Sequence, residues 1–381
     1  MNILVTGANG FLGKNLCTTL QNIKDGKDRS FGEINIGEIY KYDIDSTPQE
    51  LDNYCENCDF VFNLAGVNRP KTQDEFLAGN CGFLDTLLQL LKKHQNRCPV
   101  MLSSSIQALL DNPYGISKKA GEDLLLSYAK EQNSKAYVYR FSNLFGKWSR
   151  PNYNSVVATF CNNIASGQDI TVNDPFSVVN LCYVDDVVIE LIAALKGSPN
   201  MAADGLCYVD KVYTVTVGEI ADLVKGFKNS RGDLSVPGRQ SEFAKKLYAT
   251  YLSYIPPTQY AYDLDMKCDE RGSFSEVLRD LSCGQVSINV AKKGIVKGNH
   301  WHHTKNEKFL VVSGKGRINM RKIGESEVYT YDVSGEKLQV VDIPTGYTHN
   351  IENVGDTPLV TLMWANEAFN PDKPDTYFEK V

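Results

Sequence analysis

The sequence predicts two domains: an α/β domain with a parallel sheet over residues 1–253, and an all-β domain of the antiparallel sandwich or barrel type over residues 258–381. Three observations predict this division. The chain of 381 residues exceeds the length at which one hydrophobic core usually keeps growing. Apolar runs alternate with amphipathic stretches through the first half of the chain. After Ile255-Pro256-Pro257 the pattern changes to short apolar runs separated by Gly, Asn and Asp.

In the first domain, strands are expected at short apolar runs and helices where apolar residues recur every three or four positions. The expected strands are Ile3–Thr6, Ile39–Tyr42, Phe60–Leu64, Val100–Ser103 and Ala136–Arg140, and the expected helices are Leu12–Leu20, Phe83–Lys93 and Lys118–Glu131. Repeated alternation of strand and helix predicts a parallel sheet with helices on both faces.

In the second domain, no long helical pattern competes with the strand pattern. The expected strands are Gln285–Ala291, Glu307–Ser313, Lys337–Val341 and Leu359–Trp364. A charged, Gly/Pro-rich segment between residues 225 and 257 separates these strands from the first domain.

Composition excludes several classes of partner. The net charge of -6 argues against nucleic acid or an anionic membrane surface as a partner. No apolar run reaches 18 residues, so no transmembrane helix is expected, and the opening residues lack the basic region of a signal peptide. The ten cysteines show no regular spacing. Cys55 and Cys58 form a single C-x-x-C without a second pair, which favours two ordinary thiols over a redox or zinc site. Together these features predict a cytoplasmic protein.

A glycine-rich turn follows the first expected strand. It reads Gly7-Ala8-Asn9-Gly10-Phe11-Leu12-Gly13 and opens the first expected helix. The first two glycines allow a tight turn and a close approach to a pyrophosphate, the third allows helix and strand to pack closely, and the helix N-terminus offers free N–H groups. The turn therefore predicts a dinucleotide site on a Rossmann fold.

The second expected strand ends in Asp43, with Asp45 close by. An acidic side chain at this strand end accepts hydrogen bonds from the adenosine ribose and repels a 2′-phosphate. Asp43 therefore favours NAD(H) over NADP(H).

Tyr114 and Lys118 stand four residues apart, so they share one face if the segment is helical. A tyrosine is a poor acid or base near neutral pH, and a neighbouring ammonium lowers its pKa by stabilising the phenolate. Such a pair can exchange a proton with a carbonyl that receives hydride. Upstream, Ser103-Ser104-Ser105 follows an expected strand and offers a hydroxyl to the same oxygen.

With the glycine turn, these residues resemble the extended short-chain dehydrogenase/reductase family over about residues 1–250. Three further segments match this family: Asn63-Leu64-Ala65-Gly66, Arg140-Phe141-Ser142-Asn143-Leu144-Phe145-Gly146 and Tyr183-Val184-Asp185-Asp186. The resemblance implies that Leu64, Ala65 and Gly66 contact the cofactor and that Asn143 begins the substrate pocket. It also implies that Ser105 binds the substrate oxygen, Tyr114 is the acid/base, and Lys118 holds the ribose and tunes Tyr114. Only eight residues separate Ser105 from Tyr114, which leaves the choice among the three serines open.

Four of the five histidines lie in the last third of the chain. His300 and His302 are two residues apart, so in a strand they point to the same side. Glu307 and His349 can complete a set of three nitrogens and one oxygen, which suits Zn, Mn, Fe, Ni or Co. The spacing around them resembles both halves of the cupin signature, and His303 is expected to face outward.

A second resemblance overlaps the first. Asp269-Glu270-Arg271-Gly272-Ser273-Phe274 and the text around His300 look like the deoxysugar 3,5-epimerases of the rhamnose pathway, which share the RmlC-like jelly roll. In that family the arginine, here Arg271, binds the nucleotide diphosphate and the histidine at position 300 is the base. Here, however, His300 stands in a full metal-ligand set. An equal alternative to His300 as the base is a ketone polarised by the metal, with the proton moved by Tyr347, Lys305 or His303.

Both halves, in this order, resemble a family of bifunctional enzymes of capsular polysaccharide synthesis. The resemblance implies a role in UDP-N-acetyl-L-fucosamine synthesis. The cupin would epimerise C3 of a UDP-linked 4-keto-6-deoxy-N-acetylhexosamine, and the Rossmann domain would reduce its C4 ketone with NADPH. It also implies a homodimer with zinc in the cupin. On the cofactor, the resemblance favours NADP(H) and Asp43 favours NAD(H).

Three other hypotheses stay open at this point. The metal could only stiffen the barrel. The cupin could be a non-catalytic dimerisation or sugar-sensing module beside a working reductase. The first domain could be a 4,6-dehydratase or plain 4-epimerase, but dehydratases of this fold carry an acidic pair where Ile106-Gln107 stands.

Overall fold

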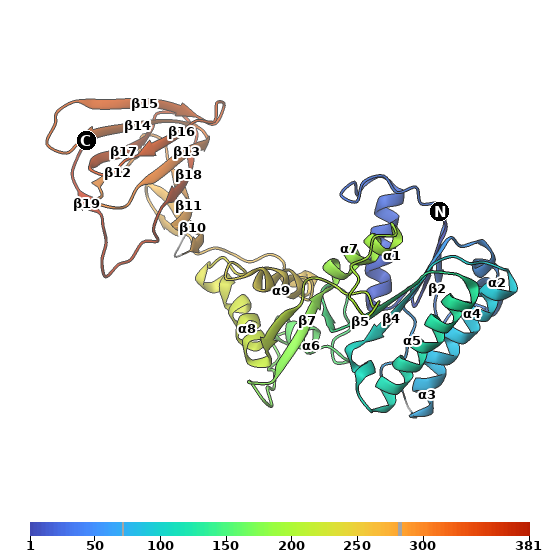
Figure 1. Cartoon of the computed structure of the whole chain (residues 1–381). Helices are drawn as coiled ribbons and strands as arrows, with labels where there is room; N and C mark the ends of the chain where they lie inside the picture. Colours follow the sequence, from blue (N-terminus) through green and yellow to red (C-terminus); the bar gives the residue numbers. More distant parts are fainter. Residues whose placement is uncertain (71, 281–283) are drawn as a thin grey trace. The chain divides into compact units, whose positions relative to one another are not determined.

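The computed structural model describes residues 1–70, 72–280 and 284–381 (Figure 1). Contacts divide the chain into two compact units, one of Met1–Lys225 with Ser241–Ile255 and one of Gly226–Gln240 with Pro256–Val381. The predicted fold class, a Rossmann domain followed by an all-β cupin, is confirmed. As domain boundaries, 1–253 and 258–381 stay a prediction.

The first unit is built on a five-stranded parallel sheet with the order β2-β1-β3-β4-β5. Its strands are β1 (Ile3–Thr6), β2 (Ile39–Tyr42), β3 (Phe60–Asn63), β4 (Val100–Ser105) and β5 (Ala136–Phe141). All five coincide with predicted strands to within two residues. Parallel pairing places the carboxyl ends of these strands at one edge, where open α/β sheets bind their ligands.

Helices cover both faces of this sheet, as predicted. Figure 1 shows α1 (Phe11–Lys24) and α7 (Val184–Leu195) on one face, and α2 (Pro48–Asn57), α4 (Phe83–Lys93) and α5 (Pro113–Gln132) on the other. The two-residue period of a strand explains how one sheet serves two cores. Ile3 and Val5 lie in the core beneath α1 and α7, whereas Leu4 between them lies in the core beneath α2, α4 and α5.

The helical part of the chain contains a second sheet and further helices. The second sheet has the order β6-β7-β8. Its strands and the remaining helical elements are β6 (Asn143–Phe145), β7 (Val178–Tyr183), β8 (Tyr213–Thr216), α3 (Asp74–Leu77), a π-helix η1 (Ala78–Gly82), the 3-10 helices η2 (Ile106–Leu109) and η3 (Pro257–Gln259), α6 (Val156–Ala165), α8 (Val217–Asp233) and α9 (Glu242–Leu252).

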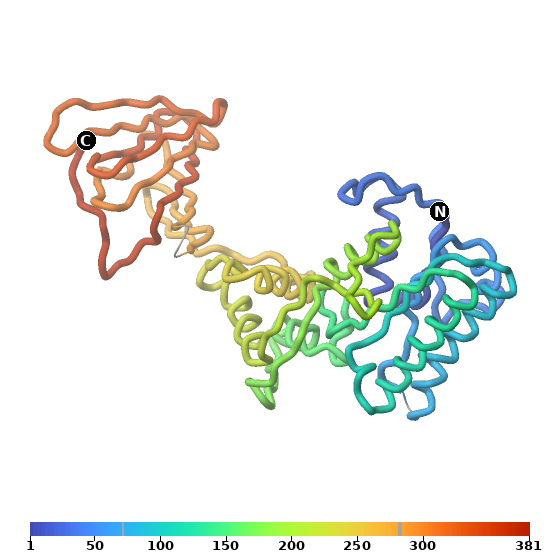
Figure 2. Tube along the Cα trace, in the orientation of Figure 1, coloured from blue at the N-terminus to red at the C-terminus, as the bar shows by residue number. Residues whose placement is uncertain are grey.

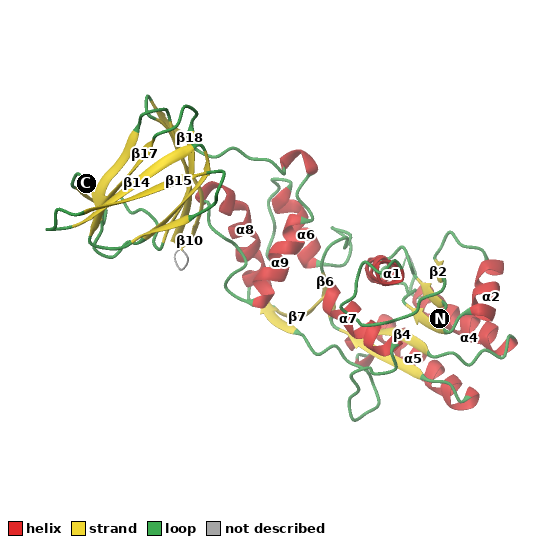
Figure 3. Cartoon of the chain, turned by 90° about the horizontal axis from the view of Figure 1, so that it is seen from above, coloured by secondary structure: helices red, strands yellow, loops and turns green. Residues whose placement is uncertain are grey.

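The second unit is an antiparallel sandwich of two sheets, with the orders β16-β13-β18-β11-β10-β9 and β15-β14-β17-β12-β19. Figure 3 shows its long strands. They are β9 (Lys267–Asp269), β10 (Gly272–Asp280), β11 (Gly284–Ala291), β12 (Val296–Trp301), β13 (Glu307–Ser313), β14 (Lys315–Lys322), β15 (Val328–Ser334), β16 (Val340–Ile343), β17 (Tyr347–Asn353), β18 (Leu359–Ala365) and β19 (Tyr377–Phe378). Between β18 and β19 the trace makes a long excursion, which can be followed in Figure 2.

The core of the sandwich is aliphatic and aromatic. Phe309 and Val311 of β13 pack with Ile318 of β14 and Ile351 of β17, and all four are buried. One predicted strand, Lys337–Val341, is wrong at its start. Lys337 makes only an isolated bridge to Ser334, because the chain turns at Gly335 and Glu336, and the ladder begins at Val340.

Two further expectations concern membranes and thiols. Within the described ranges, no helix combines the length and the apolar character that crossing a bilayer demands. The nine described cysteines are all free thiols. Cys55 and Cys58 are both buried, and the sulfur of Cys58 lies 3.8 Å from that of Cys98.

The third glycine of the turn gives a test of this packing. A Cβ at Gly13 would lie 2.1 Å from the carbonyl oxygen of Gly7, a contact with backbone that cannot move aside. We expect Gly13→Ala to lower the free energy of unfolding by about 1–3 kcal/mol, measured by urea denaturation. Gly226→Ala is the control, because nothing lies within 4 Å of its added Cβ and alanine favours a helix. Equal stabilities for the two variants would contradict the close packing.

Candidate cofactor and metal sites

The glycine turn joins β1 to α1 as a dinucleotide site requires. Gly7 has φ +65°, and a Cβ there would lie 2.8 Å from the backbone nitrogen of Ala65. Gly10 is the N-cap of α1 and offers no side chain to the first turn. The N–H groups of Phe11 and Leu12 therefore stay available to an anion at the positive end of the helix.

Asp43 lies directly beside this turn. Its carboxylate accepts a hydrogen bond from the backbone N–H of Asn9 at 2.7 Å, and the Asn9 side chain reaches Asp45 at 3.4 Å. The acidic end of β2 is thus tied to the glycine turn, at the place where the adenosine ribose of a dinucleotide lies in this fold.

Tyr114 and Lys118 both lie on α5, which begins at Pro113 with Asn112 as its N-cap. The Lys118 ammonium lies 5.8 Å from the centre of the Tyr114 ring. Burial raises the pKa of Tyr114, and a hydrogen bond with Ser105 opposes that shift. Phe76 packs against the tyrosine ring, with ring centres 5.6 Å apart. The phenol therefore lies half-buried between an aromatic wall and a serine.

The structure distinguishes the three serines that the sequence left open. Ser104 is buried and donates to Glu122 at 2.6 Å. The carbonyl of Ser103 accepts from the Lys118 ammonium at 3.0 Å. The Ser105 side chain forms a hydrogen bond with Tyr114. This matches the alternation of a strand, in which a buried residue is followed by one at the open edge.

Lys118 is a buried cation. Burial lowers its pKa to about 8, although Glu122 opposes the shift. It also lies close to the turn after β3, because a Cβ at Gly66 would come within 3.0 Å of its nitrogen. Gly66, Ala65 and Leu64 follow β3 directly, so the predicted cofactor contacts and Lys118 meet at the carboxyl edge of the sheet.

Asn80 is a residue of this site that the sequence reasoning missed. It is buried in the π-helix η1, donates to Ser117 at 2.9 Å, and exchanges hydrogen bonds with the backbone of Val67. A Cβ at Gly66 would also meet its side chain, at 2.8 Å. Single-turn π-helices are frequent at functional sites, but they cannot be predicted from a sequence pattern. Asn143 is exposed at the start of β6.

The second unit brings four predicted ligands together. One ligand atom from each of His300, His302, Glu307 and His349 lies within 4.8 Å of the others. His300 pairs with His349 across β12 and β17. His302 and Glu307 flank the short connection to β13. A Glu307 oxygen lies 3.1 Å from Nε2 of His349 and 3.6 Å from Nε2 of His302.

The chemistry of this cluster fits a metal ion. Burial lowers the pKa of His300 to about 4, with His349 adding to the effect, so its imidazole is neutral. Burial alone would raise the pKa of Glu307, but His302 and His349 beside it lower it. Nε2 of His302, Nε2 of His349 and Oε2 of Glu307 are buried without a hydrogen-bond partner in the described structure. Orphaned donors and acceptors of this kind call for a ligand.

A cavity of about 320 Å³ opens beside the cluster. His300, His302 and Glu307 line it together with Lys305, Trp364 and Phe369. The sequence offered three residues as alternative proton carriers. Lys305 is buried in the wall of this cavity. His303 is exposed and packs beside Trp301, and Tyr347 is not among the residues that line the cavity. Arg271 also lies outside the cavity lining, ion-paired with Asp269 at 2.6 Å on the surface.

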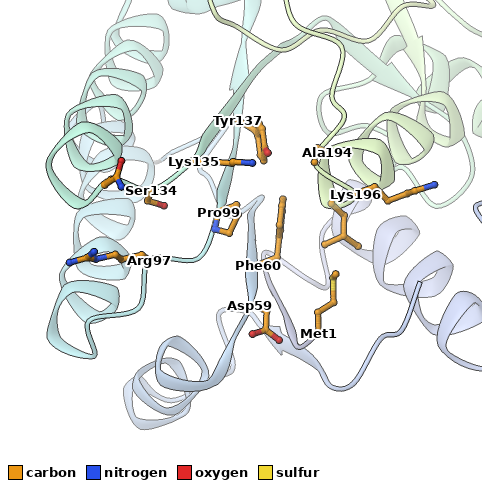
Figure 4. Close-up of a pocket in the computed structure, with 13 residues that line it drawn as sticks. Met1, Asp59, Phe60, Arg97, Pro99, Ser134, Lys135, Tyr137, Ala194 and Lys196 are labelled. Carbon is orange, nitrogen blue, oxygen red and sulfur yellow. The ribbon is translucent and has the colours of Figure 1, made fainter. Parts of the chain in front are cut away.

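Another hollow, of about 440 Å³, lies in the first unit (Figure 4). Asp59, Pro99 and Lys135 line it, next to the amino ends of β3, β4 and β5. No residue predicted for the site lines it. Because ligands of open α/β sheets bind at the carboxyl ends, the hollow is not the candidate site.

Comparison with known proteins agrees with this geometry. Residues 3–203 match the family described as NAD dependent epimerase/dehydratase family, and residues 267–377 match the polysaccharide biosynthesis C-terminal domain. The chain belongs to the NAD dependent epimerase/dehydratase family. Membership makes a nicotinamide dinucleotide the expected class of cofactor, which is the class that the Gly7–Gly13 turn and Lys118 are arranged to hold.

Relatives extend the likeness over the whole chain. A UDP-2-acetamido-2,6-beta-L-arabino-hexul-4-ose reductase of Pseudomonas aeruginosa is 40% identical over 377 residues, which are 99% of this chain and 98% of that protein. The crystal structure of the capsular polysaccharide assembling protein CapF from Staphylococcus aureus has 50% identity, a TM-score of 0.92 and complete coverage of both chains. A structure of CapF with the inhibitor 3-isopropenyl-tropolone has 46% identity and a TM-score of 0.88, again over both chains.

Lys118 predicts a pH dependence of stability. Its pKa of about 8 in the folded chain lies below the ordinary 10.5, so between these values the unfolded chain holds a proton that the folded chain has released. The penalty of burying the ammonium is full below pH 8 and disappears as pH rises to 10.5. We expect Lys118→Met to raise the free energy of unfolding of the cofactor-free protein by up to about 3 kcal/mol at pH 7. The gain should fade toward pH 10.5 in urea titrations.

The exposed neighbour Lys119 gives the control, because it lies on the same helix and pairs with Asp123 in solvent. Lys119→Met should show no such pH-dependent gain. A stability difference between wild type and Lys118→Met that is flat from pH 7 to pH 10.5 would contradict the lowered pKa.

Asp43 predicts a shift in cofactor preference. Asp43→Asn removes the charge that repels a 2′-phosphate but keeps an oxygen for the Asn9 N–H. We expect the ratio of kcat/KM for NADPH to that for NADH to rise about tenfold, measured from nicotinamide absorbance. Asp45→Asn should change it less, since Asp45 accepts from the Asn9 side chain at the longer distance of 3.4 Å. An unchanged ratio in Asp43→Asn would mean that the ribose lies elsewhere.

Proposed function

We propose that the chain is a bifunctional nucleotide-sugar enzyme of capsular or surface polysaccharide synthesis, in the UDP-N-acetyl-L-fucosamine pathway. The cupin unit epimerises C3 of a UDP-linked 4-keto-6-deoxy-N-acetylhexosamine. The Rossmann unit then reduces the C4 ketone with NAD(P)H. The observation that carries the proposal is the presence of two separate sets of chemical groups, one around Tyr114 and one around His302.

The reductase half is supported by the relative from Pseudomonas aeruginosa, whose name specifies reduction of a UDP-linked 4-ketose and which matches this chain end to end. Ser105 and Tyr114 offer two hydroxyls to the ketone oxygen. The bound nicotinamide would supply the hydride to C4. Tyr114 donates its phenolic proton to O4 as the C=O bond becomes C–OH, and the Lys118 ammonium stabilises the phenolate left behind. Asn143 would contact the sugar.

The epimerase half is supported by the buried ligand set, which His300, His302, Glu307 and His349 supply to a divalent transition metal, zinc in the proposal. When bound, such an ion supplies Lewis-acid stabilisation of negative charge on a ketone oxygen. Because the C4 ketone acidifies the C3–H bond, the protein needs a group to remove that proton and a route for its return to the other face. Lys305 is positioned for this transfer, since its side chain lies buried in the cavity wall.

The remaining parts of the proposal follow from the family resemblance. Arg271 would bind the diphosphate of the nucleotide sugar, the enzyme would work as a homodimer in the cytoplasm, and NADPH would be the reductant. Asp43 favours NADH instead, and the kinetic comparison described above decides between them.

Separate active sites predict separable defects. In deuterated water, we expect Tyr114→Phe to lower the rate of nicotinamide oxidation at least about 100-fold while deuterium still enters C3 of the 4-keto sugar, as followed by NMR. His302→Ala should lose deuterium entry at C3 but still reduce a sugar that already has the inverted C3. Loss of both activities in either variant would mean that the two sites are not independent.

The same experiment tests the alternative in which the cupin is a non-catalytic dimerisation or sugar-sensing module. In that case zinc-loaded wild type incorporates no deuterium at C3, and His302→Ala turns over the original substrate at the wild-type rate.

A further inference from the structure

The C-terminal segment between β18 and β19 returns to the cupin cluster, where Asp375 makes the largest set of its hydrogen bonds. Asn366 and Thr376 of the same segment also contact residues 302–306. β19 pairs with β12, so that Phe378 lies opposite His300 and Tyr377 opposite Trp301. This pairing places the residues just before β19 against the loop that follows His302. Figure 2 shows the excursion that brings the chain back to this position.

The Asp375 carboxylate binds residues 303–305 of that loop. One oxygen accepts from the backbone N–H of His303 at 2.9 Å. The other accepts from the N–H groups of Thr304 and Lys305 at 2.7 and 2.9 Å, and from the Thr304 hydroxyl at 3.0 Å. Four donors on one carboxylate fix the backbone from which the Lys305 side chain enters the cavity.

The backbone carbonyl of the same residue faces the ring of His302. Nδ1 of His302 and the carbonyl oxygen of Asp375 form a short hydrogen bond. A carbonyl can only accept, so Nδ1 carries a proton, and in the neutral ring the lone pair is then on Nε2. Nε2 is the atom that lies buried without a partner beside Glu307 and His349.

We propose that Asp375 is a positioning residue of the cupin site, which sets the tautomer of His302 through its carbonyl and the path of residues 303–305 through its carboxylate. One residue thereby directs a metal-binding nitrogen and the Lys305 side chain into the same cavity. This inference rests on the proposed function only for the identity of the reaction, because the two contacts are independent of the substrate.

Metal affinity tests the proposal in the full-length protein. We expect Asp375→Ala to weaken zinc binding by about 10- to 100-fold, the range typical for partners that orient metal ligands, measured by competition with a chromophoric chelator. Asp375→Asn keeps an acceptor for part of the loop and should lie between Asp375→Ala and wild type. Asp372→Ala is the matched control, since it removes the same charge from the same exposed segment and should bind zinc like wild type.

A second readout does not need metal. In metal-free wild type with ¹⁵N-labelled histidine, the His302 ring should be the Nδ1–H tautomer. Asp375→Ala keeps the backbone carbonyl but removes the carboxylate that holds this segment against residues 303–305. The carbonyl should then lose its fixed position, and His302 should populate both tautomers. The His302→Ala variant assigns the signals. A wild-type circular-dichroism spectrum and wild-type thermal unfolding transitions of both units in the full-length protein would show that the Asp375 variants are folded.

The outcomes separate this inference from the function proposed above. Wild-type zinc affinity in Asp375→Ala, or an Nε2–H tautomer of His302 in the wild type, overturns the positioning role even if the epimerase works. If zinc-loaded wild type does not exchange the C3 proton for deuterium, the epimerase proposal is overturned. The positioning role is then still decided by the zinc affinity of Asp375→Ala and by the tautomer of His302. At saturating zinc, a fall in kcat for exchange in Asp375→Ala with little change in KM would support control of Lys305.

Discussion

Buried polar atoms without partners impose the main constraint on the second unit. Nε2 of His302 and of His349 and Oε2 of Glu307 have no hydrogen bond in the described structure, and each such atom costs about 1–3 kcal/mol in a folded protein. The sandwich can carry this cost because of its hydrophobic core, from which Phe309 packs against the ring of His349. An ion that binds here recovers the cost and adds stability, so binding and folding of this unit are linked.

The first unit also contains a buried polar group that lowers its stability. Lys118 is buried with its pKa lowered, and its main partner is a backbone carbonyl rather than a carboxylate. Glu122, the nearest acidic group, is already held bidentately by Arg140 at 2.8 and 2.6 Å. The ammonium is therefore left with unused hydrogen-bonding capacity toward the cofactor edge. A lysine neutralised by a carboxylate would stabilise the fold better, but it would stabilise the phenolate of Tyr114 less.

Much of the site could be predicted from sequence because its parts are close together along the chain. Each of three motifs lies within a short stretch of regular structure: the Gly7–Gly13 turn, the pair Tyr114 and Lys118, and the pair His300 and His302. The periods of helix and strand therefore predict where their side chains lie. The choice of Ser105 over Ser104 needed the structure, because the hydroxyl of Ser104 is buried and donates to Glu122. Asn80 and Asp375 could not be found this way. They meet their partners across 37 and 72 residues, through a π-helix and an irregular segment that leave no periodic signal.

The order of the two proposed reactions follows from the ketone that both require. While C4 is a carbonyl, the C3 proton is acidic and the configuration at C3 can invert. Once Tyr114 has protonated O4 and C4 carries hydrogen, C3 is no longer acidic and its configuration is fixed. Reduction is therefore the step that makes the inversion permanent, and a chain that carries both groups of residues limits the time during which the inverted ketone can revert. This logic requires that the reductase prefer the inverted sugar, a selectivity that residues around Asn143, rather than the cupin, would have to provide.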